Sequence, residues 1–450
     1  MDKFSHIESS LEPSFIMKDI NQSILIFDGS AKLILSKENS IDIEVKCFLE
    51  WMPNTNIELH FELDNENTTL LRDAESEGEF KLEINHNEIK ECYIYKIDYA
   101  RSNRNNIIVG TNDNFIIGDN SIEVDEVKFS LVNVPLNIGS NVLRNNISVT
   151  KYGRLLLSCE KYNIQIDQLN VIDIYKDLAR TGGKLITHIG SIKKKKGSLS
   201  FEEVHEQLNL VSSFFSLLTG RRVRSLFIEG MSSDGILAWK NYSNYDTASY
   251  INVKSLIASS IGQINLQEIW QGYTKITSDN NDIDTFVFLI DIYVSINANL
   301  SINLNNSIIL AQTTLELLYN WWVIDKRNLF GKKGKDMEAV NKIRLLVSFL
   351  DIGNGYKIPS ELSELVKYVS ANSIEDAPEA IVSYRNKLVH AKSDSIEKIN
   401  DIPAKVRYEI VQIALWYIEL SILKIIDYQG AYRNRWSNEP NLEYVPWKKD

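Results

Sequence analysis

Short runs of alternating hydrophobic and polar residues dominate the first part of the chain, up to about residue 195. Clear examples are SILIFDGSAKLIL (23–35), NIELHFEL (56–63) and CYIYKIDYA (92–100), and polar breaks such as DNEN and TNDN separate these runs. A period of two places successive side chains on opposite faces of a strand, and the polar breaks are typical of turns. The pattern therefore predicts antiparallel strands arranged as a β-sandwich or an open barrel.

The period changes at GSLSFEEVHEQLNLVSSFFSLLTG, which begins at residue 197. Ser200 and Glu203 have the spacing of a capping box, apolar residues then recur at helical spacing, and Gly220 is suited to end the segment. We therefore expect one prominent helix within the strand-rich part of the chain.

From about residue 282 nearly every segment has helical periodicity. The expected helices lie in TFVFLIDIYVSINANL (285–300), NNSIILAQTTLELLYNWWVI (305–324), MEAVNKIRLLVSFL (337–350), ELSELVKYVS (361–370), APEAIVSYRNKLVHA (377–391) and KVRYEIVQIALWYIELSILKIIDY (405–428). We therefore predict an α+β multidomain protein, with a β-rich N-terminal domain over residues 1–275 and an all-α helical bundle over residues 276–450.

Composition and charge narrow the classes of function. The chain is 44% hydrophobic and 24% charged, as in globular proteins with sizeable cores. Its formal net charge is −11, and nearly all of the acidic excess lies before residue 280. A protein that binds nucleic acid without regard to sequence usually has a basic excess, so the N-terminal part does not look like one.

The sequence favours a cytoplasmic protein. The first residues lack a basic start followed by an apolar block, and the three cysteines are few and far apart, as in a reducing compartment. The most apolar segment, residues 410–426, is shorter than the ~20 residues of a membrane span and contains Gln412, Glu419 and Lys424. There is no Cys-x-x-Cys pair, HExxH pair or phosphate-binding glycine loop, so no metal or cofactor is expected.

The stretch SYRNKLVHAK (383–392) carries the strongest candidate chemistry. Asp376 and Pro378 predict the start of a helix, and His390 falls at or just beyond its end. Arg385 and His390 are five residues apart, so on an ideal helix their side chains diverge by about 140° with a rise of about 7.5 Å. If they act together, the helix must end between them, or two copies of the chain must bring their motifs face to face.

These residue types suit RNA cleavage. A histidine with an ordinary pKa of ~6.5 can remove the proton of a ribose 2′-hydroxyl near neutral pH. The planar fork of an arginine can hold two phosphate oxygens, and the amide of Asn386 can donate a further hydrogen bond. No metal is needed, because the substrate supplies its own nucleophile. If the motif has no catalytic role, Arg385 is an ordinary surface arginine and His390 is a histidine favoured by the dipole at a helix end.

RNKLVH (385–390) resembles the Arg–polar–variable–His motif of HEPN domains, helical ribonucleases and accessory modules of prokaryotic defence systems. NNSIILAQTTLELLYNWW resembles the acidic early helix of that fold, with Glu316 in the matching place. The N-terminal segment THIGSIKKKKGSLSFEEVHEQLNLVSSFFSLLTGRRV resembles the N-terminal domain of ApeA-type anti-phage proteins.

This resemblance implies an abortive-infection endoribonuclease, in which an N-terminal sensing domain regulates a HEPN domain. The implied substrate is host RNA, with tRNA as a candidate, and the implied assembly is a homodimer through the HEPN domain. His390, Arg385, Asn386 and Glu316 are then the expected catalytic residues. The phage-derived trigger is not identified by the sequence.

Lysines near the motif and in the basic connector FGKKGKD are candidates for contacting the RNA backbone; they are Lys387, Lys392, Lys332 and Lys333. Two alternatives stay open. The helical domain could bind RNA or a partner protein without catalysis, or it could be a dimerisation scaffold for an N-terminal domain that senses a ligand.

Overall fold

The structure, a computed structural model, describes residues 7–448 apart from 53, 79, 86, 102, 112–114, 137, 145–147, 243–246, 257–263, 330–333, 335, 353–354, 391–400 and 437–441. The chain divides into two compact units. The first comprises the residues up to Ser212 together with Val223–Tyr250, and the second comprises Ser213–Arg222 together with the residues from Ile251 onward. The expected domain boundary at residue 275 falls inside helix α4 (Leu266–Thr277), which groups with the second unit.

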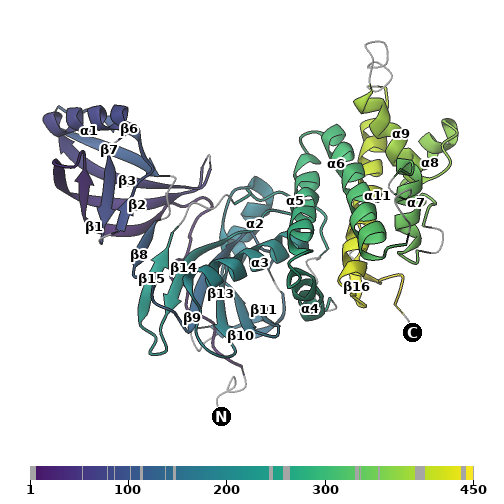
Figure 1. Cartoon of the computed structure of the whole chain (residues 1–450), viewed down its shortest axis with the longest axis horizontal. Coiled ribbons are helices and arrows are strands. Elements are labelled where there is room, and N and C mark those ends of the chain that lie inside the picture. The colour runs from purple at the N-terminus through teal and green to yellow at the C-terminus, as the bar shows by residue number, and fades with distance from the viewer. Residues whose placement is uncertain are drawn as a thin grey trace. The chain divides into compact units, whose positions relative to one another are not determined.

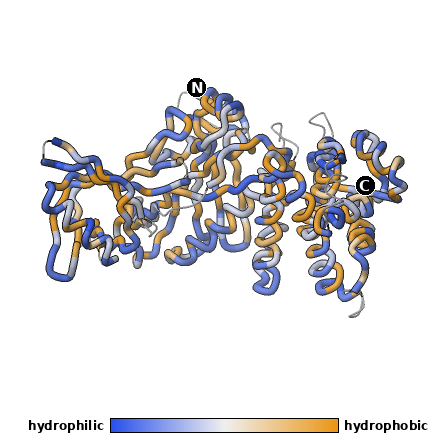
Figure 2. Tube along the Cα trace, turned by 90° about the horizontal axis from the view of Figure 1, so that it is seen from above, coloured by the Kyte–Doolittle hydropathy of each residue, from blue (hydrophilic) through white to orange (hydrophobic). Residues whose placement is uncertain are grey.

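A seven-stranded antiparallel sheet forms the first part of unit 1, in the order β5-β4-β1-β2-β3-β7-β6. Buried and exposed residues alternate along its strands, as the period of two in the sequence requires, and Figure 2 shows the same alternation of hydropathy. One helix, α1 (Asn65–Glu77), follows β3 directly. The strands are β1 (Ile24–Ile34), β2 (Ser40–Glu50), β3 (Asn56–Asp64), β4 (Lys81–Ile84), β5 (Asn87–Ile89), β6 (Cys92–Asp98) and β7 (Arg104–Thr111).

An eight-stranded sheet forms the rest of unit 1, in the order β10-β11-β12-β13-β9-β14-β15-β8. Helix α2 (Ile172–Thr181) follows β12, and α3 (Phe201–Thr219) is the helix predicted from the capping pattern at Ser200. Glu203 of α3 pairs with Lys194 of β13 at 2.8 Å. The strands are β8 (Ile116–Gly118), β9 (Glu126–Val132), β10 (Ser140–Arg144), β11 (Ser148–Ser158), β12 (Tyr162–Gln168), β13 (Ile186–Lys194), β14 (Ser225–Met231) and β15 (Leu237–Asn241).

Unit 2 is helical apart from a small hairpin near its C-terminal end (Figure 1). The prediction of an α+β multidomain protein with a β-rich N-terminal half and a helical C-terminal region is therefore confirmed. The further elements are α5 (Ile283–Asn299), α6 (Leu304–Leu318), the π-helical segment η1 (Tyr319–Lys326), α7 (Ala339–Ser348), α8 (Ser363–Ala371), α9 (Ala377–Val389), α11 (Ala404–Ile425), β16 (Ala431–Arg433) and β17 (Leu442–Tyr444).

Helix α11 forms the centre of unit 2. It packs against α6, α8 and α9, and nearly all of its residues from Glu409 to Leu423 are buried. Its hydrophobic residues lie on all sides, which is typical of a helix enclosed by others. No helix in the described ranges is both long and apolar enough to cross a membrane.

The guanidinium of Arg435 is fully buried beside α11. It donates to Glu419 of α11 at 2.8 Å, to Asn297 of α5 at 2.8 Å and to the backbone carbonyl of Lys254 at 3.0 Å. Tyr293 of α5 donates to the same carboxylate at 2.6 Å. Burial raises the pKa of Glu419, and the positive charge of Arg435 opposes that rise. One cation thus joins α5, α11 and the chain segments before α4 and after β16.

We predict that Arg435→Met lowers the free energy of unfolding of unit 2 by about 3–5 kcal/mol, because Glu419 would lose its buried counter-ion. Denaturant unfolding followed by tryptophan fluorescence measures this, since Trp270, Trp321, Trp322, Trp416, Trp436 and Trp447 all lie in unit 2. A second variant that adds Glu419→Leu should recover most of the loss. Equal losses in the two variants would show that the ion pair is not the cause.

Candidate functional site

Helix α9 carries the Arg385–His390 motif and has a strongly defined start. Asp376 is its N-cap, accepts a hydrogen bond from the backbone N–H of Glu379 at 2.9 Å, and precedes a proline in the first turn. The other oxygen of the Asp376 carboxylate accepts a hydrogen bond from Arg344 of α7 at 2.7 Å. This bond raises the pKa of Arg344, so the pair is a charge-assisted link between α7 and α9.

The motif itself lies at the C-terminal end of α9. Arg385 is half-buried and donates to the side-chain oxygen of Asn386 at 3.1 Å, whereas Asn386 and His390 are exposed. The helix ends at Val389, so its end lies between the arginine and the histidine. The backbone N–H of His390 nevertheless donates to the carbonyl of Asn386 at 3.0 Å, and this bond keeps His390 close to its helical position.

Tyr384, directly before Arg385, anchors this end of α9 in the bundle. It is buried, and its hydroxyl donates to Asn305 at the start of α6 at 3.1 Å. Burial raises the pKa of Tyr384, and a hydrogen bond with Arg407 at the start of α11 opposes the rise. Helices α6, α9 and α11 therefore meet at Tyr384, directly before the motif in the sequence.

Arg407 is a candidate that the sequence analysis missed. The Nε atoms of Arg385 and Arg407 are both buried and have no hydrogen-bond partner within the described part of the chain. An unpaired buried donor is costly, and in native structures it calls for an explanation such as a ligand or an ordered water. Nothing in KVRYEI (405–410) marks Arg407, because its position depends on how α11 packs against α9.

Of the four candidate lysines, the structure describes one, Lys387. Lys387 is exposed and donates to the hydroxyl of Tyr368 on α8 at 3.1 Å, so it lies on the same helix as the motif but is directed toward α8. The positions of Lys392, Lys332 and Lys333 lie outside the described residues.

Glu316 lies apart from the motif within one chain. Its carboxylate accepts a hydrogen bond from Gln312, one turn earlier on α6, and pairs with Lys342 of α7 at 3.4 Å. Tyr384 contacts Asn305, which is eleven residues before Glu316 and therefore about 16 Å away along α6. The structure thus brings Arg385, Asn386 and His390 to one end of the bundle and places Glu316 elsewhere.

This arrangement offers an exposed imidazole, an exposed amide and two partly buried guanidinium groups. An imidazole can move a proton, and guanidinium groups with free N–H donors can bind phosphate. In the described part of the chain, no group of three or more His, Cys, Asp and Glu side chains is placed to hold a metal ion.

We expect Asp376→Ala to lower the free energy of unfolding by about 2 kcal/mol, because it removes the N-cap of α9 and the bond to Arg344. Urea unfolding of the full chain measures the change. Glu375→Gln is the matched control: its exposed ion pair with Arg344 should contribute less than about 1 kcal/mol. If Asp376→Ala and Glu375→Gln lowered the free energy of unfolding equally, the N-cap would not be the cause of the loss.

Comparisons with known proteins find similarity to two domain families. Residues 119–253 match the YopA central domain, and residues 279–444 match the YopA C-terminal domain. The SPbeta prophage-derived uncharacterized protein YopA of Bacillus subtilis (strain 168) is 22% identical over 450 residues, which cover 98% of each chain. No solved structure matches this chain. The chain is thus similar over nearly its whole length to a distant prophage-derived relative, and two of its segments are similar to YopA domains.

Proposed function

We propose that this protein is a metal-independent endoribonuclease that cleaves RNA at the C-terminal end of α9. The observation that carries the proposal is the pair formed by Arg385 and His390 at that end. Within the described part of the chain, the buried Nε of Arg385 has no hydrogen-bond partner, and His390 is exposed directly after the last turn of α9. An arginine with an unused donor suits a phosphate ester, and an accessible imidazole suits the proton of the neighbouring 2′-hydroxyl.

In the proposed reaction, His390 takes the proton of a ribose 2′-hydroxyl. The 2′-oxygen then forms a bond to phosphorus, and the bond from phosphorus to the 5′-oxygen breaks. The leaving 5′-oxygen receives a proton from an imidazolium or from water, so the products are a 2′,3′-cyclic phosphate and a 5′-hydroxyl. Arg385 binds the non-bridging oxygens as negative charge increases on them, and Asn386 donates a further hydrogen bond.

A homodimer would complete this site. The five-residue separation of Arg385 and His390 turns their side chains apart on one helix, and the ordinary backbone bond from His390 to Asn386 does not reverse that. Two motifs that face each other would bring the arginine of one copy toward the histidine of the other. Ile302, which is 80% exposed just before α6, and the exposed Val389 provide apolar surface at the same end.

The biological setting we propose is anti-phage defence by abortive infection. It rests on the resemblance of RNKLVH and of the N-terminal segment to HEPN and ApeA-type proteins. In this setting the protein acts in the cytoplasm on host RNA, with tRNA as a candidate, under the control of unit 1. The relative from Bacillus subtilis is described as prophage-derived, which places that protein in a phage-related context.

A second candidate is a helical module that binds RNA or a partner protein without cutting RNA. The observation that favours it is the position of Glu316, which pairs with Lys342 and not with Arg385. A site that lacked its acidic member could still hold phosphate through Arg385 and Arg407.

We predict that His390→Ala abolishes RNA cleavage and leaves the fold intact, because the exposed imidazole makes no packing contribution that alanine would lose. Sequencing of total RNA with end mapping after brief induction measures cleavage through new 5′-hydroxyl ends. Lys357→Ala, an exposed cation of the same unit, is the control and should cleave like wild type. Cleavage by His390→Ala at the wild-type rate would refute the assignment, and RNA binding without cleavage by the wild type would favour the second candidate.

We also predict that the active species is a dimer. Sedimentation velocity should give about twice the 51.6 kDa of one chain, and Ile302→Glu should shift the equilibrium toward the monomer and reduce cleavage. A chain that cleaves RNA as a monomer at every concentration would contradict the proposed facing motifs.

A further inference from the structure

The seven-stranded sheet of unit 1 contains a fork between β2 and β3. The ladder between these strands runs from Glu50↔Asn56 to Lys46↔His60. Both strands continue beyond that point, β2 back to Ser40 and β3 on to Asp64, but the described residues of these extensions are not paired with each other. On their outer sides, β2 stays paired with β1 and β3 stays paired with β7 over the same stretch.

The reason for the fork is visible in the register. If the ladder continued, Glu44 would lie opposite Glu62, and Asp42 would lie opposite Asp64. Like charges directly opposite each other destabilise a pair of strands, and two such pairs in succession favour separation. The separation leaves backbone N–H and C=O groups of both strands facing the gap. Unpaired backbone groups of this kind normally occur on edge strands, but here they lie in the middle of the sheet.

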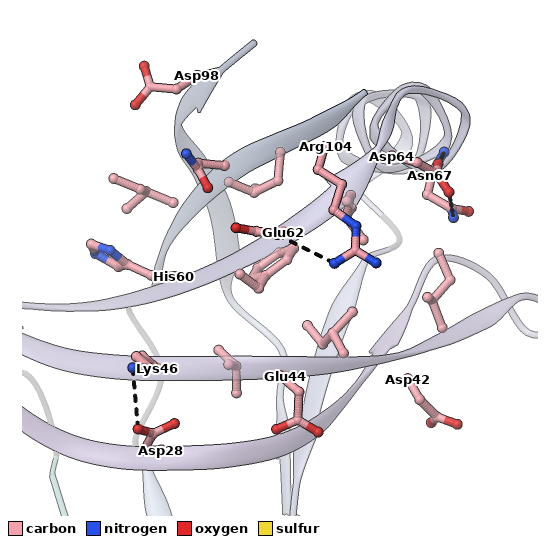
Figure 3. A pocket seen from close by; sticks show the side chains of 18 residues that line it. Asp28, Asp42, Glu44, Lys46, His60, Glu62, Asp64, Asn67, Asp98 and Arg104 are labelled. Atoms are coloured by element: carbon pink, nitrogen blue, oxygen red, sulfur yellow. Dashed lines mark hydrogen bonds and ion pairs between the residues drawn. The ribbon is translucent and has the colours of Figure 1, made fainter. Parts of the chain in front are cut away.

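A cavity of about 810 Å³ lies at the fork. Its lining includes residues from both diverging strands, together with the buried Val45 and Phe61 of the sheet core. Figure 3 shows Glu44 and Asp42 along one side, and Glu62 and Arg104 across from them. Binding sites for ligands and short peptides have volumes of this order.

The cavity carries a strong negative charge. Its lining has six carboxylates, namely Asp28, Asp42, Glu44, Glu62, Asp64 and Asp98, against the two cations Lys46 and Arg104. Both cations are already paired, Lys46 with Asp28 at 3.5 Å and Arg104 with Glu62 at 3.6 Å. The net charge of the lining is therefore −4 before His60 is considered, which repels nucleic acid and attracts a cation.

We propose that the fork between β2 and β3 binds an extended, lysine- or arginine-bearing segment of a partner protein. Such a segment adds to the free strand edges through its backbone, and its alternate side chains reach the carboxylates on the face of the sheet. Side chains two apart on a strand are about 6.6 Å apart along it, which is also the spacing of Asp42 to Glu44 and of Glu62 to Asp64.

The two observations narrow the ligand in different ways. The charge alone would suit a polyamine or a metal ion, and either could also bind the backbone carbonyls, but neither can accept hydrogen bonds from the N–H groups of the two strands. The free edges alone would suit any extended chain, and the charge selects a basic one. The proposal does not depend on the ribonuclease activity, and its test involves no RNA.

The test uses the full chain and a fluorescent, end-blocked peptide of about ten residues in which lysine alternates with threonine. Fluorescence anisotropy at about 0.15 M salt measures binding while long-range charge effects are screened. We expect saturable binding, weakened at least roughly tenfold by the double substitution Asp42→Asn and Glu44→Gln.

The matched control removes two charges from α1 through Asp73→Asn and Glu77→Gln, both exposed and outside the cavity. This variant should bind within about twofold of wild type. A second peptide in which lysine alternates with proline keeps the charge but loses half of the N–H donors, and it should bind at least roughly tenfold more weakly.

Four results would overturn the proposal. Equal weakening in the two double variants would mean that only overall charge matters. Equal binding of the proline peptide, or displacement of the threonine peptide by an equal concentration of spermine, would mean that strand addition is absent. A lack of saturable binding to wild type would mean that the fork is not a site for basic segments. Circular dichroism of both variants excludes unfolding as the cause of any loss.

Discussion

The buried guanidinium of Arg435 fixes the position of α11, and α11 in turn positions the candidate active site. Removing a cation and a carboxylate from water is expensive, so such a pair is retained only where its geometry satisfies nearly every donor. Arg435 meets this condition by binding Glu419, Asn297 and the carbonyl of Lys254 at once. Glu419 is twelve residues, or about 18 Å of helix, from Arg407 at the other end of α11. A rotation or shift of α11 would break the contact between Glu419 and Arg435 and would move Arg407.

Several elements of the fold could be predicted from local signals. The cap at Asp376, the proline after it and the end of α9 near His390 are all properties of a few neighbouring residues. The same holds for α3, which has a capping pair at its start and Gly220 after its end. By contrast, α1 lies inside the strand-rich part of the chain. Its sequence NENTTLLRDAESE is mostly polar, and only three of its residues are buried, so it lacks a clear apolar stripe.

Features that depend on long-range pairing could not be predicted. The fork in the sheet follows from the register of β2 against β3, which no single segment encodes. Arg435 has the appearance of a surface residue in AYRNRWSN, and its burial depends on a carboxylate sixteen residues earlier. Of the candidate site, the sequence identified the pair at the end of α9 but not Arg407. It also suggested Glu316 as a catalytic residue, whereas the carboxylate of Glu316 pairs with Lys342 from α7.

The fork and the motif have one physical property in common: among the residues that the structure describes, both places have strong hydrogen-bonding groups without partners. At the fork these are backbone groups of two strands held apart by facing carboxylates, and at the end of α9 they are the Nε donors of Arg385 and Arg407. Local features that lower stability without compensation inside the protein are concentrated at functional sites. Under the two proposals, the opposite charges of these places suit different ligands. A cavity with a net charge of −4 cannot hold RNA, and a cationic helix end does not attract a basic peptide, so recognition of a protein and contact with RNA would be separate tasks of the two units.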